Sequence, residues 1–297
     1  MLEKLGANVF TRSMTQTTHL AVNKLAPEWS YRKAHKLLLK PKSKKVNLDQ
    51  LPYGINTQRV VSSEGTLQAY HVGNGPAVLL IHSWNGGAYQ YFALMRGLAE
   101  CGFKAISFDH FGHGNSSGGN SALHRFINGV NIMLKFTLSN SPAGMAGIVA
   151  HSMGTVALVN AKPDFIGDTP IMLVSPIFRF RDYFSLLVNV PGLHPQLCNQ
   201  YLARFEKSTR IVPDRIGLIE QLPQYASQTL LIHDKNDQIS SFRDSLKFIS
   251  DNPSARLYPM QNLGHDRIIQ SESVWLQLKA LLNYREIHQL SADPTKS

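Results

Sequence analysis

Residues 145–154 have the sequence Met-Ala-Gly-Ile-Val-Ala-His-Ser-Met-Gly, which is the most informative segment for the fold class. Its apolar first part is typical of a strand buried on both faces, and a helical pattern continues to about residue 161. Ser152 therefore stands at the apex of a sharp turn from strand to helix. The residues two before and two after such an apex crowd each other, and here Ala150 and Gly154 are both small. The stretch predicts a strained elbow that exposes a serine hydroxyl above a sheet.

The same alternation of strand and helix extends outward from the elbow in both directions. Further strands are predicted at 58–61, 67–72, 77–81, 104–108, 170–174, 229–232 and 255–258, the first two as a hairpin around Glu64-Gly65. Helical patterns lie between the later strands, at about 87–99, 122–136, 242–249 and 274–287. Such a series predicts an α/β fold, with a mostly parallel sheet, helices on both faces and ligands at the carboxyl ends of the strands.

A serine hydroxyl is a weak nucleophile at neutral pH, so the elbow requires a histidine base and a carboxylate elsewhere. Loops after two late strands supply candidates. Asp234 and Asp237 follow the strand at 229–232, and His265 follows the strand at 255–258. His233 and His151 are the rival histidines.

An ester carbonyl attacked by serine also needs donors for its developing negative charge. The Met153 N–H lies at the start of the helix after the elbow, where the helix dipole favours an anion. The loop His82-Ser-Trp-Asn-Gly-Gly87 follows an early strand, and its glycines permit close backbone approach. These two segments are the predicted sources of the oxyanion donors.

Four motifs, in this order, resemble those of the α/β-hydrolase fold superfamily, in its serine-nucleophile, capped branch. They are the loop at 82–87, the turn Asp109-His-Phe-Gly-His-Gly-Asn-Ser116, the elbow, and the pair of loops that carry Asp237 and His265. The resemblance covers about residues 57–288. The chain order is also similar to that of the family, because the nucleophile comes first, the acid second and the base third.

The resemblance implies a role for each candidate. Ser152 is the nucleophile, His265 the base and Asp237 the acid, which is preferred to Asp234 because the family places the acid several residues past the strand. The backbone N–H groups of Met153 and Trp84 form the oxyanion hole. Ser83, Phe111 and Ala150 stand where the family usually has Gly, Pro and Gly, and Ser83 bears on the oxyanion loop because Gly reaches backbone angles that strain Ser.

The positive charge divides the chain into parts. Residues 1–53 hold ten basic and three acidic residues, which together supply +7 of the net charge of +10 of the whole sequence. We expect a basic N-terminal arm at 1–53 with an amphipathic helix between Pro27 and Pro41, then an α/β-hydrolase domain at 54–290 and a flexible tail at 291–297. The preferred interpretation is that this helix docks on the body. The alternative is a weak contact with a membrane surface. Nucleic acid binding is disfavoured because no nucleic-acid module accompanies the helix.

Composition narrows the class of protein. With 43% hydrophobic and 17% charged residues the chain is neither disordered nor fibrous, and no apolar run is long enough to cross a membrane. We see no secretory signal and expect a cytoplasmic protein. Neither Cys101 nor Cys198 belongs to a Cys-x-x-Cys motif or has the spacing of metal ligands, so both are expected to be small buried side chains. His110 and His113 beside Asp109 are interpreted as parts of a structural turn, so neither a metal nor a cofactor is expected.

After the strand at 170–174 the alternation stops for about fifty residues, which predicts a small helical cap at about 177–226. Its aromatic side chains are Phe178, Phe180, Tyr183, Phe184 and Tyr201. As a group they favour an apolar substrate. The predicted function is a serine hydrolase that cleaves a carboxylic ester with a hydrophobic acyl group. Alternatives are a thioesterase or acyltransferase on the same triad, or a non-catalytic small-molecule receptor on this fold.

Overall fold

The computed structural model describes residues 40–183, 199–200, 202–204, 206–207, 212 and 215–291. The chain divides into two compact units. One comprises Met1–Lys40 and Arg179–Gly217, and the other, which we call the body, comprises Pro41–Phe178 and Leu218–Ser297. The predicted helix of the basic arm, most of the predicted cap, including Phe184 and Tyr201, and the tail from residue 292 lie outside the described residues.

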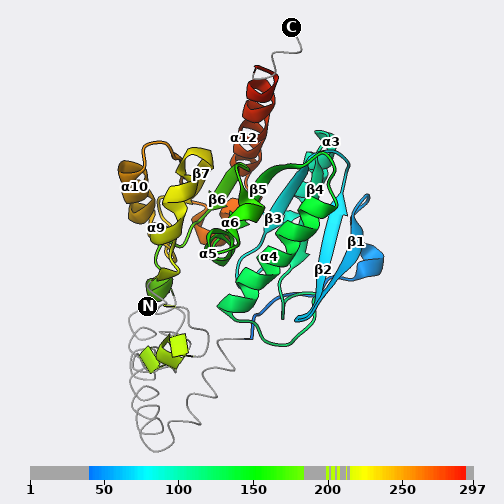
Figure 1. The fold of residues 1–297 in the computed structure, drawn as a ribbon, viewed down its shortest axis with the longest axis horizontal. Coiled ribbons are helices and arrows are strands. Elements are labelled where there is room, and N and C mark those ends of the chain that lie inside the picture. The colour runs from blue at the N-terminus through cyan, green and yellow to red at the C-terminus, as the bar shows by residue number, and fades with distance from the viewer. Residues whose placement is uncertain are drawn as a thin grey trace, which may run out of the picture. The chain divides into compact units, whose positions relative to one another are not determined.

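The body contains an eight-stranded sheet with the order β1-β2-β4-β3-β5-β6-β7-β8 (Figure 1). The strands are β1 (Asn56–Ser62), β2 (Gly65–Val72), β3 (Ala77–Ile81), β4 (Lys104–Asp109), β5 (Met145–His151), β6 (Ile171–Val174), β7 (Thr229–Asp234) and β8 (Arg256–Met260). β2 runs antiparallel to both of its neighbours, β1 and β4. From β4 to β8 every pair is parallel, so the loops that follow these strands gather at one edge of the sheet.

Helices cover both faces of this sheet. They are α3 (Phe92–Glu100), α4 (Leu123–Ser139), α5 (Met153–Val159), α6 (Pro163–Ile166), α9 (Leu218–Gln221), α10 (Phe242–Asp251), α11 (Gly264–Arg267) and α12 (Glu272–Ser291), with 3-10 turns η1 (Leu48–Gln50), η2 (Ala88–Tyr91), η4 (Leu222–Gln228) and η5 (Ile268–Gln270). Apolar side chains of α3 and α12 share one buried core with β3 and β7. The α4 helix contacts α5 and β3 and lies in front of the sheet in Figure 1.

The burial of the strands explains why they could be read from the sequence. All five residues of β3 and all four of β6 are buried, because helices cover the sheet on both sides. A strand in this position needs an unbroken apolar run, which is the pattern that predicted it. The predicted α/β fold with a mostly parallel sheet, and the hairpin of β1 and β2, are therefore confirmed.

One expectation about the body is wrong. Cys101 is exposed rather than buried. It caps the C-terminal end of α3 and precedes Gly102, whose φ of 85° turns the chain toward β4 at the surface. The position in a turn decides its exposure, whereas the average tendency of cysteine does not. Cys198 lies outside the described residues.

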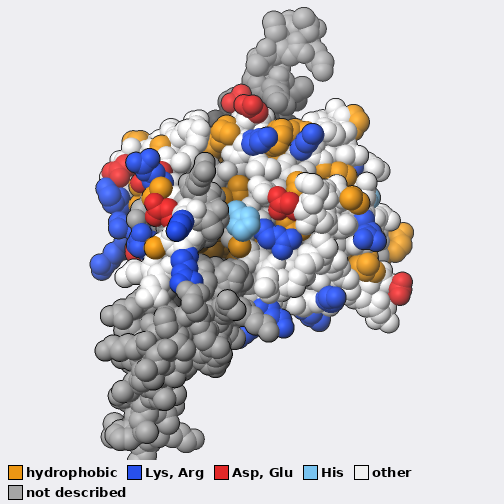
Figure 2. Space-filling model, turned by 60° about the horizontal axis from the view of Figure 1, so that its bottom comes forward, with side chains coloured by type: hydrophobic (Ala, Val, Ile, Leu, Met, Phe, Trp, Pro, Cys, Tyr) orange, Lys and Arg blue, Asp and Glu red, His pale blue; other side chains and the backbone are white. Residues whose placement is uncertain are grey.

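The surface of the described part carries charge of both signs. Figure 2 shows basic side chains spread over one face, with fewer acidic side chains among them. Among the described residues, no helix is both long and apolar enough to span a membrane.

Candidate active site

Ser152 occupies the turn between β5 and α5 in a backbone conformation that non-glycine residues rarely adopt. Its φ is 52° and its ψ is −118°. Its own N–H donates to the Val174 carbonyl at 3.0 Å, which holds the turn against β6. A Cβ added to Gly154 would lie 2.8 Å from the carbonyl oxygen of His82, so only glycine lets the elbow approach the loop after β3 this closely. The strain is thus fixed by close packing on both sides.

A continuous chain of hydrogen bonds joins the three predicted side chains. The Ser152 Oγ lies 2.7 Å from His265 Nε2, and His265 Nδ1 lies 2.7 Å from Asp237 Oδ2. Ser152 is 2% exposed, and the Asp237 side chain has no exposed surface. With Nδ1 protonated and donating to the carboxylate, Nε2 is free to accept the serine proton. The structure therefore brings together residues that are 28 and 113 positions apart in the sequence.

The surroundings of Asp237 keep its carboxylate ionised. Oδ1 accepts hydrogen bonds from the backbone N–H groups of Ile239 and Ser240 at 2.8 and 3.0 Å. Oδ2 faces both His265 and His233, the latter at 3.3 Å. Burial alone would raise the pKa of Asp237, but the hydrogen bonds with the two imidazoles outweigh it and hold this pKa far below its usual range. An ionised carboxylate at this place stabilises positive charge on His265.

The rival acid has a different task. Asp234 accepts the Leu263 N–H at 2.6 Å through one oxygen and the Asn236 N–H at 2.7 Å through the other. It thereby ties the loop that carries His265 to the end of β7. Burial opposes ionisation, but these backbone bonds lower the pKa of Asp234 below its usual value. Asp234 holds the loop, and Asp237 contacts the imidazole.

Sequence reasoning missed several supports of His265. His151, considered above as a rival base, is buried and its Nε2 lies 2.9 Å from the His265 carbonyl oxygen. The Ser175 hydroxyl donates to the same carbonyl at 3.2 Å. Burial lowers the pKa of His151 to about 4, so its imidazole is neutral near pH 7 and donates there as an uncharged group. The position of His151 next to Ser152 was the only sequence signal for a role here.

The predicted oxyanion loop, residues 82–87, is held by two buried imidazoles. His82 Nδ1 contacts the Ser83 carbonyl oxygen at 2.6 Å while its Nε2 accepts the His110 N–H at 3.1 Å, which fixes the tautomer. His113 Nε2 contacts the Trp84 carbonyl oxygen. Burial lowers the pKa of His82 to about 4 and that of His113 to about 3, so both are neutral at pH 7.

The peptide between Ser83 and Trp84 carries the predicted oxyanion donor. Its carbonyl is held by His82, and also accepts the Gly86 N–H at 3.0 Å, so the opposite N–H of Trp84 has a fixed direction. In the described part of the chain, the N–H groups of Trp84 and Met153 have no acceptor. Non-glycine residues with positive φ among the described ones are Ser152, Ser175 and Asn262, so the serine at position 83 brings no such strain.

The turn at 109–116, interpreted above as structural, contains a network of hydrogen bonds around Asp109. Asp109 Oδ1 accepts the Ala88 N–H, and Oδ2 accepts the Asn115 N–H, each at 2.9 Å. His110 stacks on Phe126 with ring centroids 3.8 Å apart, and neither of its ring nitrogens has a hydrogen-bond partner among the described residues. The Asp109 carboxylate is thus occupied by backbone donors, which hold the turn against the start of η2.

One other group of side chains has the chemistry of metal ligands. His151, His265 and Asp266 offer ligand atoms within 4.8 Å of one another in the described part. However, Nδ1 and Nε2 of His265 already contact Asp237 and Ser152. A metal bound at His265 would displace one of these partners, so we assign this group to the hydrogen-bonded chain rather than to a metal.

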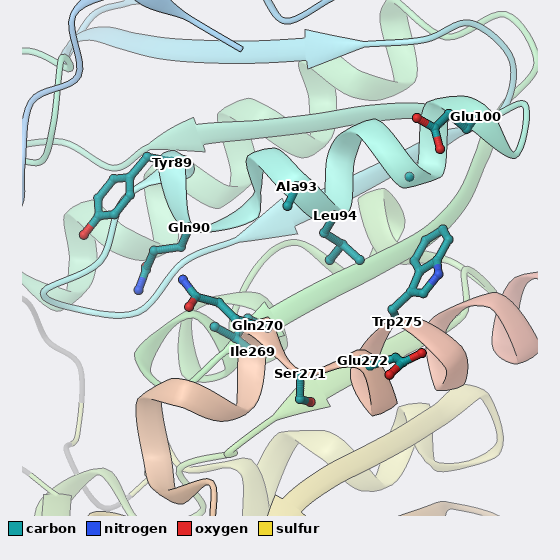
Figure 3. Close-up of a pocket in the computed structure, with 11 residues that line it drawn as sticks. Tyr89, Gln90, Ala93, Leu94, Glu100, Ile269, Gln270, Ser271, Glu272 and Trp275 are labelled. Atoms are coloured by element: carbon teal, nitrogen blue, oxygen red, sulfur yellow. The ribbon is translucent and has the colours of Figure 1, made fainter. Parts of the chain in front are cut away.

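A cavity of about 570 Å³ lies between the segments that follow the predicted oxyanion loop and the loop of His265, and Ser152 does not line it. Figure 3 shows that one wall comes from η2 and α3 and the other from η5 and the start of α12, with the amides of Gln90 and Gln270 facing each other. The η2 turn directly follows the oxyanion loop, and η5 directly follows the helix of His265. None of the three hydrogen-bonded side chains lines this cavity, so it is not the place of an attacked carbonyl.

Comparisons with known proteins agree with this architecture. The profile of the alpha/beta hydrolase fold family matches residues 76–160. No curated protein sequence matches the chain significantly.

Solved structures are similar at low sequence identity. An esterase from Pyrococcus furiosus is 16% identical, with a TM-score of 0.61 over 83% of this chain and 99% of that one. Est1E from Butyrivibrio proteoclasticus, solved with ferulic acid bound, is 15% identical, with a TM-score of 0.57 over 79% and 99%. A thioesterase domain from the curacin biosynthetic pathway is 16% identical, with a TM-score of 0.53 over 77% and 99%. The chain therefore has the α/β-hydrolase fold.

Proposed function

We propose that this protein is a serine hydrolase that cleaves carboxylic esters through an acyl-enzyme on Ser152. The observation that carries the proposal is the hydrogen-bonded chain from Asp237 through His265 to Ser152, with both distances at 2.7 Å, on a strained elbow. A serine activated in this way attacks acyl groups, and the similar structures include esterases.

The reaction follows from the positions of the groups. The Ser152 Oγ attacks the ester carbonyl carbon while His265 Nε2 takes the hydroxyl proton, and Asp237 stabilises the resulting imidazolium. The Met153 and Trp84 N–H groups donate to the oxyanion. When the bond to the leaving oxygen breaks, His265 returns the proton to the departing alcohol. A water molecule, deprotonated by His265, then attacks the acyl carbon and releases a carboxylic acid and free Ser152.

The same residues support a thioesterase as the second candidate. One similar structure is a thioesterase domain, and a thiolate leaves an acyl carbon as readily as an alcohol in this mechanism.

We expect a hydrophobic acyl group in either case. Phe178 is buried against Phe248, with ring centroids 5.6 Å apart, so this aromatic side chain contributes to packing. A series of p-nitrophenyl esters and acyl thioesters from acetyl to palmitoyl separates the two activities and measures the preferred chain length.

The decisive experiment is intact-protein mass spectrometry after treatment with a fluorophosphonate, which reacts with activated serine and requires no knowledge of the substrate. We expect one adduct on the parent protein, mapped to Ser152 and lost in Ser152→Ala and His265→Ala. Ser107→Ala is the matched control, because its buried hydroxyl donates to the Leu80 carbonyl at 3.0 Å, away from any imidazole. A folded parent without an adduct would contradict the proposal and favour a non-catalytic small-molecule receptor.

A further inference from the structure

The segment from Pro41 to Asn47, which we call the N-terminal strap, belongs to the body although it lies within the predicted basic arm, residues 1–53. It has no regular secondary structure. Pro41 is buried, and Val46 packs against the apolar core that α3 and α12 share with the sheet. The strap is therefore buried at Pro41 and packed against the core at Val46, and polar residues lie between these two positions.

The first half of the strap contacts the oxyanion loop. The Lys42 N–H donates to Asn85 Oδ1 at 3.0 Å. The Ser43 hydroxyl donates to the Gly86 carbonyl at 2.7 Å, the shortest of the hydrogen bonds between strap and body. His82 and His113 contact two other carbonyl groups of the same loop, those of Ser83 and Trp84.

The strap also contacts the turn at 109–116. The Gly114 N–H donates to the Ser43 hydroxyl at 3.0 Å. Val46 and Asn115 exchange two hydrogen bonds, each of 3.0 Å, and the Asn115 N–H donates to Asp109. The Ser43 oxygen thus accepts from one loop and its proton is donated to the other, which makes this hydroxyl a bridge between them.

The bridge acts on the residue that orients the Trp84 N–H. Gly86 donates its N–H to the Ser83 carbonyl. This carbonyl and the Trp84 N–H belong to the same peptide group. Gly86 in turn is held through its own carbonyl by Ser43. Without the hydroxyl, Gly86 keeps the bond to Ser83 but loses its tie to the turn at 109–116. Small displacements of an oxyanion donor weaken its bond to the transition state more than they weaken substrate binding.

We propose that Ser43 is a positioning residue for hydrolysis at Ser152, acting through Gly86 on the Trp84 N–H. The inference rests on the proposed function, because it requires an oxyanion to form at this loop. It assigns a role in the reaction to a residue of the segment that precedes the sheet, more than one hundred positions before the nucleophile.

Three variants test this role. Ser43→Ala removes the bridge, and Ser43→Thr keeps the hydroxyl. Ser62→Ala is the matched control, because the Ser62 hydroxyl has the same pattern of bonds: it donates to the Gly65 carbonyl at 2.9 Å and accepts the Glu64 N–H at 3.3 Å, in the hairpin of β1 and β2. The measurements are kcat and KM on a p-nitrophenyl ester, the rate of fluorophosphonate labelling, and hydrogen exchange of residues 82–90.

We expect Ser43→Ala to lower kcat and the labelling rate by about tenfold with KM changed by less than about twofold, since misplaced groups cost rate rather than binding. Exchange in residues 82–90 should increase. Ser43→Thr should restore most of the rate, and Ser62→Ala should behave as the parent does.

Each other result overturns the inference in a recognisable way. Unchanged exchange in Ser43→Ala means that the hydroxyl does not hold the loop, whatever the activity. Faster exchange with unchanged kcat means that it holds the loop but does not position the donor. A parent protein that neither hydrolyses esters nor reacts with the fluorophosphonate removes the proposed function, and the positioning role with it.

Discussion

The loops on the two sides of the candidate site mostly contact different kinds of side chain, although one neutral imidazole, His151, contacts the His265 carbonyl. On the oxyanion side, buried neutral imidazoles, those of His82 and His113, contact the carbonyl groups of the loop. On the acid–base side, two ionised carboxylates, Asp234 and Asp237, accept backbone N–H groups of the loops that carry His265 and Ser240. A loop that exposes carbonyl groups needs donors, and a loop that exposes N–H groups needs acceptors.

This difference determines how each side responds to change. Because the pKa values of Asp234 and Asp237 are lowered, both carboxylates are charged near pH 7, and removing this charge alters both the chemistry and the loop. A neutral buried imidazole packs against its neighbours and donates a single proton to a carbonyl oxygen. The oxyanion side therefore depends on close packing and on these imidazoles remaining uncharged. The three predictions below test this contrast.

The largest effect is expected from Asp237→Asn on the acid–base side. An asparagine favours the wrong tautomer of His265, and we expect kcat to fall by about 10⁴-fold while the fold is kept. Asp234→Asn is the matched variant, because it leaves the imidazole untouched and weakens the bonds to Leu263 and Asn236. It should lower the free energy of unfolding by about 1–3 kcal/mol and kcat much less. Ester hydrolysis and urea unfolding of both variants provide the measurement, and a reversed order would assign the acid to Asp234.

Gly154→Ala tests the packing between the elbow and the oxyanion loop. The new Cβ would meet the carbonyl oxygens of His82 and Ile81 at 2.8 and 2.9 Å, which is too close, so the backbone must shift. We expect about a hundredfold loss of kcat/KM, because small displacements of reacting groups have effects of this size. Gly119→Ala is the control, since a Cβ there meets no atom within 4 Å. Equal activity in the two variants would show that the elbow tolerates the shift.

Most of the fold and much of the site could be predicted, because both depend on local patterns. The strand β3 is buried on both faces, and an unbroken apolar run is the only sequence that suits it. The elbow needs small residues at Ala150 and Gly154, and their spacing is visible without knowing what they touch. The loops of Asp237 and His265 follow strands, where parallel sheets place their functional residues.

Contacts between distant segments could not be predicted. Nothing in the sequence around His113 indicates that its ring contacts the Trp84 carbonyl, and nothing around Ser43 indicates a bond to Gly86. Such pairings arise only when loops from different strands meet at one edge of the sheet. Exposure also depends on this context, which is why the expected burial of Cys101 was wrong.

The smallest effect concerns pH and the third buried imidazole of the oxyanion side, His110. It is fully buried, lacks hydrogen-bond partners in the described part, and burial lowers its pKa well below the usual value of 6.5. In the folded state it stays unprotonated, whereas in the unfolded chain it binds a proton below pH 6.5. The unfolded state therefore binds more protons as pH falls, so folding stability decreases with acidification from about pH 6.5 downward.

His110→Phe removes this proton from the balance and keeps an aromatic ring on Phe126, on which His110 now stacks. Relative to the parent, the variant should gain about 1.4 kcal/mol of unfolding free energy between pH 7.5 and 5.5, since one proton per molecule is involved. Urea unfolding at the two pH values measures this difference. Asp237 provides the contrast, because a carboxylate with a lowered pKa loses its stabilising effect only as pH falls below its ordinary value of 3.8. A pH-independent difference between variant and parent would mean that His110 binds its proton in the folded protein as it does in the unfolded chain, and the buried imidazoles of this side would then not all be neutral.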